Sequence, residues 1–297
     1  MQDNNFRSGF AAIIGKPNVG KSTLVNRLVG EKIAIVSPKP QTTRSRLMGI
    51  VNRPSAQIVL LDTPGIHKAK DKLGQFMMDS VSSALSGIDA LLIMLNAESI
   101  KEQDKSIARQ YENLDVPAFL LINKTDAVHP TTLLPIMDEF SSFNFKAILP
   151  ISAKTGEGLD KLMDMLIESM PKGPKYFPDD MITDQPERVL IAEIIREKAL
   201  LYLNQEVPHG VGVEVIKIEN TSETLSKVHA TIYCEKNSHK KIIIGAGGSM
   251  IKKIGSEARA NIEMLLGRQV HLDLWVKVRE NWKNSAHDLK TLGYTEG

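Results

Sequence analysis

The first 170 residues alternate short apolar runs with longer polar segments whose apolar positions have helical spacing. An alternation of this kind predicts βα units around a largely parallel sheet. The predicted strands are short and apolar, and they span residues 10–14, 45–51, 58–61, 90–95, 118–122 and 148–151. Because ligands of open α/β sheets bind at the carboxyl ends of strands, the residues directly after these runs are the candidates for chemistry.

The pattern changes in a stretch that holds Pro171, Pro174, Pro178 and Pro186 and has no apolar periodicity. Neither a helix nor a sheet is expected there. We therefore expect a first domain at 1–172, a linker at 173–187, a second domain at 188–283 and a C-terminal tail at 284–297. The second domain is predicted to run helix, two strands, two helices and a strand, at 189–203, 210–219, 226–235, 250–253, 257–266 and 270–279.

Composition narrows the class of protein. A chain of 297 residues suits two globular domains, and its longest apolar runs are far below the ~20 residues that span a bilayer. Residues 1–8 are too polar for a signal peptide. Cys234 is the only cysteine, which excludes an intramolecular disulfide and a cysteine zinc site and favours a reducing cytoplasm. The net charge of +2 predicts no nucleic-acid partner by itself.

The segment GKPNVGKS follows the first predicted strand and precedes a helix that ends near Gly30. It matches the phosphate-binding pattern GxxxxGK[ST], in which backbone N–H groups cradle phosphates, Lys21 reaches the β and γ phosphates and Ser22 binds Mg²⁺. A chance glycine-rich turn is the alternative, and the strand–loop–helix context argues against it. The loop residues are Gly15, Lys16, Pro17, Asn18, Val19, Gly20, Lys21 and Ser22.

The run 58–61 is followed by Asp62, Thr63, Pro64 and Gly65. A carboxylate at this strand end can hold Mg²⁺ through water, and the N–H of Gly65 can meet the γ-phosphate. Taken alone, this tetrapeptide is more often a structural turn. Its position downstream of the phosphate-binding loop favours the nucleotide site.

The run 119–122 is followed by Asn123, Lys124, Thr125 and Asp126. The Asp126 carboxylate can accept hydrogen bonds from the N1–H and N2–H₂ donors of guanine, a pair that adenine lacks, so the predicted nucleotide is GTP or GDP. Ser152, Ala153 and Lys154 follow the last strand and would close over the base through the N–H of Ala153. As a tripeptide, SAK is more often a plain loop.

Five motifs in this order resemble the translation-factor-related class of GTPases. The resemblance implies that 37–44 is the effector loop, in which Thr42 or Thr43 binds Mg²⁺ and senses the γ-phosphate, although a polar connector would look similar. With Lys21 and Gly65, these threonines are the expected catalytic residues. Ile66 stands where many GTPases have a water-orienting glutamine, which predicts slow intrinsic hydrolysis or another source of that function. Related families bind K⁺ with an asparagine at the position of Asn18, so a K⁺ site there is a hypothesis beside a structural role.

The second domain contains Ile244, Gly245, Ala246, Gly247 and Gly248 in the pattern IGxxGxxI, which is typical of KH RNA-binding modules. The interval 236–256 has five lysines and no acidic residue, which favours a polyanion. Alternation in 270–279 places Trp275, Lys277 and Arg279 on one strand face, where they could contact RNA or form an ordinary solvated surface. The expected RNA-binding residues are Lys241, Ile244, Gly245, Ala246, Gly247, Gly248, Lys252, Lys253, Trp275, Lys277 and Arg279.

A GTPase domain followed by a type II KH domain resembles the Era family of ribosome-assembly GTPases, as do the stretches QTTRSR, DTPGIH and LDLWVKVRENWK. The resemblance implies an α/β P-loop GTPase domain with a mixed, mostly parallel sheet, followed by an α+β KH domain. It also implies hydrolysis of GTP to GDP with Mg²⁺, and binding near the 3′ end of 16S ribosomal RNA during 30S assembly. A cytoplasmic monomer with peripheral association at the inner face of the cell membrane is expected. The alternatives are a constitutive RNA-binding protein and a P-loop ATPase or small-molecule kinase.

Overall fold

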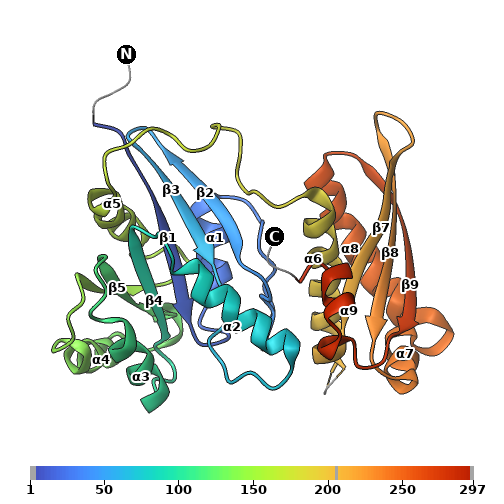
Figure 1. The fold of residues 1–297 in the computed structure, drawn as a ribbon, viewed down its shortest axis with the longest axis horizontal. Coiled ribbons are helices and arrows are strands. Elements are labelled where there is room, and N and C mark those ends of the chain that lie inside the picture. The colour runs from blue at the N-terminus through green and yellow to red at the C-terminus, as the bar shows by residue number, and fades with distance from the viewer. Residues whose placement is uncertain (1–4, 205–206, 295–297) are drawn as a thin grey trace. The chain divides into compact units, whose positions relative to one another are not determined.

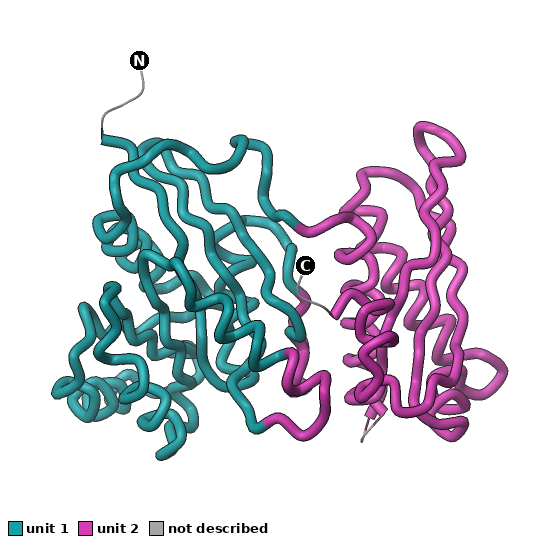
Figure 2. The backbone as a smooth tube through the Cα atoms, in the orientation of Figure 1, with its two compact units in different colours: residues 1–34, 43–68, 77–184 teal, residues 35–42, 69–76, 185–297 magenta. Residues whose placement is uncertain are grey.

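The computed structural model describes residues 5–204 and 207–294. They form two compact units, which Figure 2 distinguishes by colour. The first unit comprises the described residues within 1–34, 43–68 and 77–184. The second comprises those within 35–42, 69–76 and 185–297. Two short segments from the amino-terminal half of the sequence, 35–42 and 69–76, therefore belong to the second unit.

The first unit is built on a six-stranded sheet with the order β2-β3-β1-β4-β5-β6 (Figure 1). Strand β2 is antiparallel to β3, and the other neighbours are parallel, which confirms the predicted mixed, mostly parallel sheet. The strands are β1 Arg7–Gly15, β2 Leu47–Arg53, β3 Ala56–Asp62, β4 Ala90–Asn96, β5 Ala118–Asn123 and β6 Ala147–Ile151.

Helices cover both faces of this sheet. On one face α1 (Lys21–Val29) and α5 (Leu159–Ser169) pack with alternate strand residues into one apolar core. On the other face the second core takes residues from α2 (Lys72–Ala84), α3 (Glu102–Tyr111) and α4 (Leu133–Phe140). A strand covered on both faces is mostly apolar, and every residue of β3 is buried, including the polar Gln57 and Asp62.

The proline-rich stretch is not a free linker over most of its length. Residues up to 184 belong to the first unit, where Tyr176 stacks on Phe10 with ring centroids 5.3 Å apart. The buried side chain of Gln57 accepts hydrogen bonds from the backbone N–H groups of Tyr176 and Phe177, at 2.8 and 2.9 Å. Proline excludes regular structure here, yet an extended segment can still satisfy its backbone groups against the sheet.

The second unit has a three-stranded sheet with the order β7-β8-β9, in which β7 is antiparallel and β9 parallel to β8. Helices α6, α7 and α8 share one apolar core with these strands (Figure 1). The elements are α6 Glu187–Tyr202, β7 Gly212–Asn220, β8 Leu225–Cys234, α7 Asn237–Ile244, α8 Ser249–Leu266, β9 Gln269–Val278 and α9 Ala286–Thr291. Short 3-10 turns lie at Thr125–Ala127, Pro130–Thr132, Pro208–Gly210, Ala246–Gly248 and Trp282–Asn284.

The order α-β-β-α-α-β agrees with the prediction, but the two central helices were placed wrongly. The segments predicted at 250–253 and 257–266 are one continuous helix, α8, and the other helix is α7, which was missed. Gly255 interrupts the apolar pattern of α8 without ending the helix. Helix α7 buries only His239 and Ile243, so its sequence carries almost no helical periodicity.

The residues expected to form a tail fold onto the second unit. Ser285 caps the start of helix α9, and its hydroxyl accepts a hydrogen bond from the N–H of Asp288 at 3.2 Å. Leu289 and Tyr294 are buried, and Tyr294 stacks on Trp282 at 6.2 Å. The last part of the expected tail, 295–297, and residues 1–4 of the first domain lie outside the described residues.

Candidate nucleotide site and nucleic-acid groove

The GKPNVGKS loop joins the end of β1 to the start of α1. Its turn depends on left-handed backbone at Asn18 (φ 64°) and Gly20 (φ 105°). A Cβ at Gly20 would lie 2.3 Å from Nδ2 of Asn123, so this position requires glycine. The ammonium of Lys21 donates to the carbonyls of Gly15 and Lys16, at 3.2 and 3.1 Å. Burial lowers the pKa of Lys21 to about 8. A phosphate bound beside the ammonium would favour its charged form again.

Three oxygen-bearing side chains meet beside this loop. The hydroxyl of Ser22 donates to Oδ2 of Asp62 at 2.6 Å and lies 2.9 Å from Oγ1 of Thr43. Burial raises the pKa of Asp62, although the charge of Lys21 acts in the other direction. The second carboxylate oxygen, Oδ1, is buried and has no hydrogen-bond partner among the described residues. Hard oxygen donors with an unsatisfied buried carboxylate fit Mg²⁺.

The structure separates the two threonines of the expected effector loop. Only Thr43 lies beside Ser22. The hydroxyl of Thr42 donates to the carbonyl of Lys39 at 2.7 Å and lies 2.9 Å from the hydroxyl of Ser37, so it is used inside the loop. The sequence motif alone does not distinguish these neighbours.

The Asp62–Gly65 turn approaches the phosphate-binding loop closely. A Cβ at Gly65 would lie 2.6 Å from the backbone nitrogen of Pro17, so only glycine fits there. The hydroxyl of Thr63 donates to the carbonyl of Ile13 at 2.7 Å, which fixes the turn to β1. The N–H of Ile66 donates to the carbonyl of Gly15 at 3.0 Å, and its side chain packs against the apolar core. Ile66 therefore anchors the turn and cannot orient a water by hydrogen bonding.

The ends of β5 and β6 form the expected base-binding corner. The buried amide of Asn123 donates to the carbonyl of Val19 at 2.7 Å and accepts from the N–H of Ala153 at 2.9 Å. The hydroxyl of Ser152 donates to Oδ1 of Asp126 at 2.7 Å, and the exposed Lys154 ammonium lies 3.8 Å from Oδ2. These bonds hold Asp126 in place while its second oxygen can accept from a ligand.

Three further residues of the nucleotide motifs have side chains engaged with acids that sequence reasoning did not identify. Lys16 pairs with Asp104 of α3 at 2.5 Å. The same carboxylate accepts from the N–H of Lys101 at 2.8 Å, as expected for a helix N-terminus. Lys124 pairs with Glu98 at 3.1 Å, and the Thr125 hydroxyl lies 3.4 Å from Glu157. These contacts hold the nucleotide-binding loops through residues outside the motifs. The three acidic residues belong to no recognisable sequence motif.

The loop Gly245–Gly248 lies between α7 and α8, as a KH module requires. Gly247 and Gly248 have positive φ, and a Cβ at either would meet nothing within 4 Å. Ala246 and Gly247 are exposed, as are Lys241 and Lys252 on the flanking helices. The backbone of the loop is thus open to a ligand. Unlike Lys241 and Lys252, Lys253 makes a cation–π contact within the protein, because its ammonium lies 4.0 Å above the ring of Tyr202.

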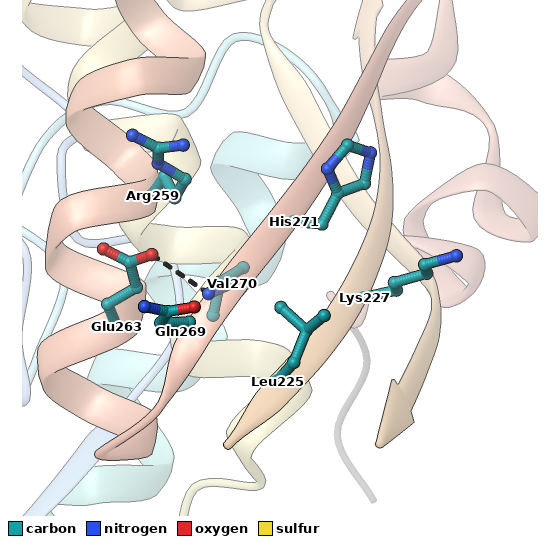
Figure 3. A pocket seen from close by; sticks show the side chains of 7 residues that line it. All are labelled: Leu225, Lys227, Arg259, Glu263, Gln269, Val270 and His271. Carbon is teal, nitrogen blue, oxygen red and sulfur yellow. Dashed lines mark hydrogen bonds between the residues drawn. The ribbon is translucent and has the colours of Figure 1, made fainter. Parts of the chain in front are cut away.

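A groove of about 460 Å³ runs between α8 and β9. Ile251, Leu272 and Leu274 are among its apolar lining residues, and Lys252 and Arg259 bring positive charge. A second hollow continues it toward the start of β9, and both hollows share Arg259 and His271. Figure 3 shows Arg259 and Glu263 projecting from α8 and His271 from β9. Of this lining, only Lys252 was predicted from the sequence as an RNA-binding residue. The signal for the others on α8 is the helical spacing of Ile251, Gly255 and Arg259.

Trp275, Lys277 and Arg279 do not line this groove. Trp275 alternates with buried Val276 and so lies on the sheet face opposite the helices, where it is 48% exposed and stacks on His229 at 5.9 Å. Lys277 lies beside it on the same face. The guanidinium of Arg279 lies 4.1 Å from the Tyr233 ring centroid and pairs with Asp288 at 3.2 Å. The structure therefore divides the expected RNA-binding residues between two surfaces.

Known proteins resemble both parts of the chain. Residues 10–124 match the family of 50S ribosome-binding GTPases, and residues 206–283 match the KH domain family. GTPase Era of Ruminiclostridium cellulolyticum is 49% identical over 292 residues, which cover 98% of each chain. The chain belongs to the Era family of GTPases. No helix within the described ranges is long and apolar enough to cross a membrane.

Two solved Era structures agree with the sites described above. Each is 40% identical with a TM-score of 0.94, and the match covers 98% of this chain and all of the Era chain. One is Era in complex with MgGDPNP and nucleotides 1506–1542 of 16S ribosomal RNA. The other is a substituted form of Aquifex aeolicus Era bound to GDP·AlF4⁻. Members of the family thus bind both kinds of ligand that the two sites fit.

Proposed function

We propose that this chain is a GTP-hydrolysing switch that binds 16S ribosomal RNA near its 3′ end and acts in 30S subunit assembly. Nucleotide binding is assigned to the region 1–172 and RNA binding to 188–283. Family membership and the ligands of the solved Era structures support both assignments. The observation that carries the proposal is the position of one stretch of chain, residues 35–43. Residues 35–42 belong to the unit with the KH fold, and the next residue, Thr43, lies beside Ser22.

In the nucleotide site, Lys21 and the loop N–H groups bind the phosphates, and the N–H of Gly65 meets the γ-phosphate. Ser22, Thr43 and Asp62 would hold Mg²⁺, which supplies charge neutralisation to the leaving phosphate when bound. Asp126 selects guanine through Oδ2, the carboxylate oxygen that Ser152 does not occupy. Because Ile66 cannot orient a water, slow intrinsic hydrolysis is expected without a partner. These roles agree with the contacts that each residue makes.

We also propose that Asn18 takes part in binding K⁺, because this exposed residue stands in left-handed backbone at the turn of the phosphate-binding loop. A monovalent cation there would stabilise negative charge between the β and γ phosphates. Hydrolysis should then be several-fold faster in K⁺ than in Na⁺ at equal ionic strength. Equal rates in the two salts would leave Asn18 with a structural role only.

Coupling of the two functions is attributed to helix α6. The buried guanidinium of Arg196 donates to the carbonyl of Thr42 and pairs with Glu193. Burial alone would lower the pKa of Arg196, but Glu193 and other nearby groups hold it above its ordinary value. Glu197 accepts from the N–H of Val36 at 3.0 Å. A nucleotide that moves Thr43 must therefore also displace a segment held by the second unit.

Crosslinking of the GTP-bound chain to cellular RNA tests the proposed function. Reads should accumulate at the 3′ end of 16S ribosomal RNA. A variant with Gly247→Asp and Gly248→Asp is the matched control, because two carboxylates on the open loop repel phosphate without filling the core. Reads spread over the transcriptome, or unchanged by this variant, would contradict the proposal. A cytoplasmic location, peripheral membrane association and a monomeric state stay predictions from the family resemblance.

A further inference from the structure

Helix α8 contains a glycine that its own structure does not require. Gly255 is the only glycine among the 18 residues of the helix, and its φ is not in the left-handed region. A Cβ at this position would meet only Cδ2 of Leu274, at 3.8 Å, which is ordinary van der Waals contact. Glycine in a helix interior lowers helix stability relative to alanine. Neither the backbone nor the packing of the unit explains its presence.

Gly255 lines the groove between α8 and β9. Ile251 lies one turn before it and Arg259 one turn after it on the same helix face. The opposite wall includes the half-buried Leu274 of β9. Within the described part of the chain β9 pairs only with β8, so no strand pairs with the backbone groups of its outer edge. One of its donors, the N–H of Val270, is taken by Glu263. The missing side chain thus opens a space with apolar walls and a hydrogen-bonding edge.

The charges around this space favour a polyanion. Lys252 and Arg259 form no ion pair with any residue that the structure describes, and both line the groove. Glu257, the nearest acid along the helix, bonds the hydroxyl of Tyr202 and does not line the groove. Glu263, one turn after Arg259, accepts a hydrogen bond from the N–H of Val270 at 3.0 Å, as Figure 3 shows. The cations are therefore available to phosphates on either side of Gly255.

We propose that Gly255 is a specificity-determining residue whose missing side chain leaves room for one unstacked RNA base. The inference rests on the proposed RNA-binding function. Gly248 and Gly255 are about 10 Å apart along the helix axis, at 1.5 Å per residue. A strand whose backbone lies on the Gly245–Gly248 loop can therefore place a neighbouring base over Gly255. The base has apolar faces for Ile251 and Leu274 and polar edges for the free edge of β9.

The test compares Gly255→Leu and Gly255→Ala with Ala260→Leu in the full-length chain. Ala260 is exposed on α8 and does not line the groove, so its substitution controls for added bulk. Affinity is measured for a fluorescent RNA with the sequence of the 3′ end of 16S ribosomal RNA. Gly255→Leu should weaken binding by about tenfold or more, the value of one lost base contact. Gly255→Ala should weaken it less, and Ala260→Leu should leave it unchanged.

Stability and activity separate this effect from misfolding. The thermal midpoint of both Gly255 variants should equal or exceed that of the unsubstituted chain, because alanine and leucine are better helix formers. Basal GTP hydrolysis without RNA is measured in all three variants, and the Ala260→Leu control should leave it unchanged. A weaker binder that is more stable is the expected result, and damage to the fold would not produce it.

A scan of abasic RNA positions identifies the base. One abasic position should weaken binding to the unsubstituted chain and have no effect on Gly255→Leu, since the contact is already lost. If Gly255→Leu binds RNA as tightly as the unsubstituted chain, or if the two losses simply add at every position, this assignment is overturned and the proposed function stands. If the unsubstituted chain does not bind the RNA, the proposed function is overturned and this assignment with it.

Discussion

The two carboxylate oxygens of Asp126 have different surroundings. Oδ1 accepts from Ser152 at 2.7 Å, whereas Oδ2 lies 3.8 Å from an exposed lysine and can accept from a guanine. Adenine offers this oxygen no donor, and an acceptor that a bound base shields from water without a donor is costly. The bond from Ser152 thus fixes one oxygen of the side chain that we propose selects the nucleotide.

Asp126→Asn should reverse this choice, because an amide nitrogen donates to the 2-oxo group of xanthine. The affinity for GDP should fall by about a hundredfold or more, and the affinity for xanthosine diphosphate should rise. Titration with fluorescent analogues of GDP and xanthosine diphosphate measures the two affinities. Lys154→Ala, which removes the exposed ammonium, should leave the preference unchanged. An unaltered preference in Asp126→Asn would remove the basis for guanine recognition.

Thr42 and Thr43 are adjacent in sequence but have different partners. Thr43 joins Ser22 and Asp62, and Thr42 bonds within its own loop. Thr43→Ala should reduce the hydrolysis rate by about tenfold or more and raise the Mg²⁺ concentration needed for half-maximal activity. Thr42→Ala should leave that Mg²⁺ concentration unchanged. Rates measured over a Mg²⁺ titration decide between them, and the opposite pattern would move the metal site to Thr42.

At the scale of elements, the sequence predicted what has a strong local signal. Apolar runs located all six strands of the first unit, and each nucleotide motif lies just after the strand expected to carry it. Helix α7 was missed because it buries only two residues. Helix α8 was split because Gly255 breaks the apolar pattern. The positions of 35–42 and α9 depend on long-range contacts, such as Trp282 with Tyr294, that no local pattern encodes.

Helix α6 holds the segment 35–42 through a buried guanidinium. Arg196→Met keeps the length of the side chain but leaves Thr42 without its donor and Glu193 without its partner. The cost in stability should be about 3 kcal/mol, as for other broken buried pairs. Trypsin should also cleave faster at Arg44. Arg188→Met on the same helix, whose guanidinium bonds the carbonyl of Val215 at 2.8 Å, is the control. Equal cleavage in both variants would show that Arg196 does not hold the segment.

At the scale of the whole molecule, two binding functions share one chain. Apart from residues 37–42 of the effector loop, the nucleotide motifs lie in the first unit, whereas the glycine loop and its groove lie in the second. A ligand can shift a conformational equilibrium only if it binds the two states with different affinities, and such coupling acts equally in both directions. The segment that ends at Thr42 belongs to the second unit, and the next residue, Thr43, lies beside Ser22 in the first. A constitutive RNA-binding protein would not need this connection.

The affinity of the full-length chain for the 3′ end of 16S ribosomal RNA, measured with a non-hydrolysable GTP analogue and with GDP, tests this account most directly. Binding should be at least about fivefold tighter with the analogue, which is a typical coupling between two sites. Identical affinities in the two nucleotide states would contradict the central claim that the nucleotide site controls RNA binding.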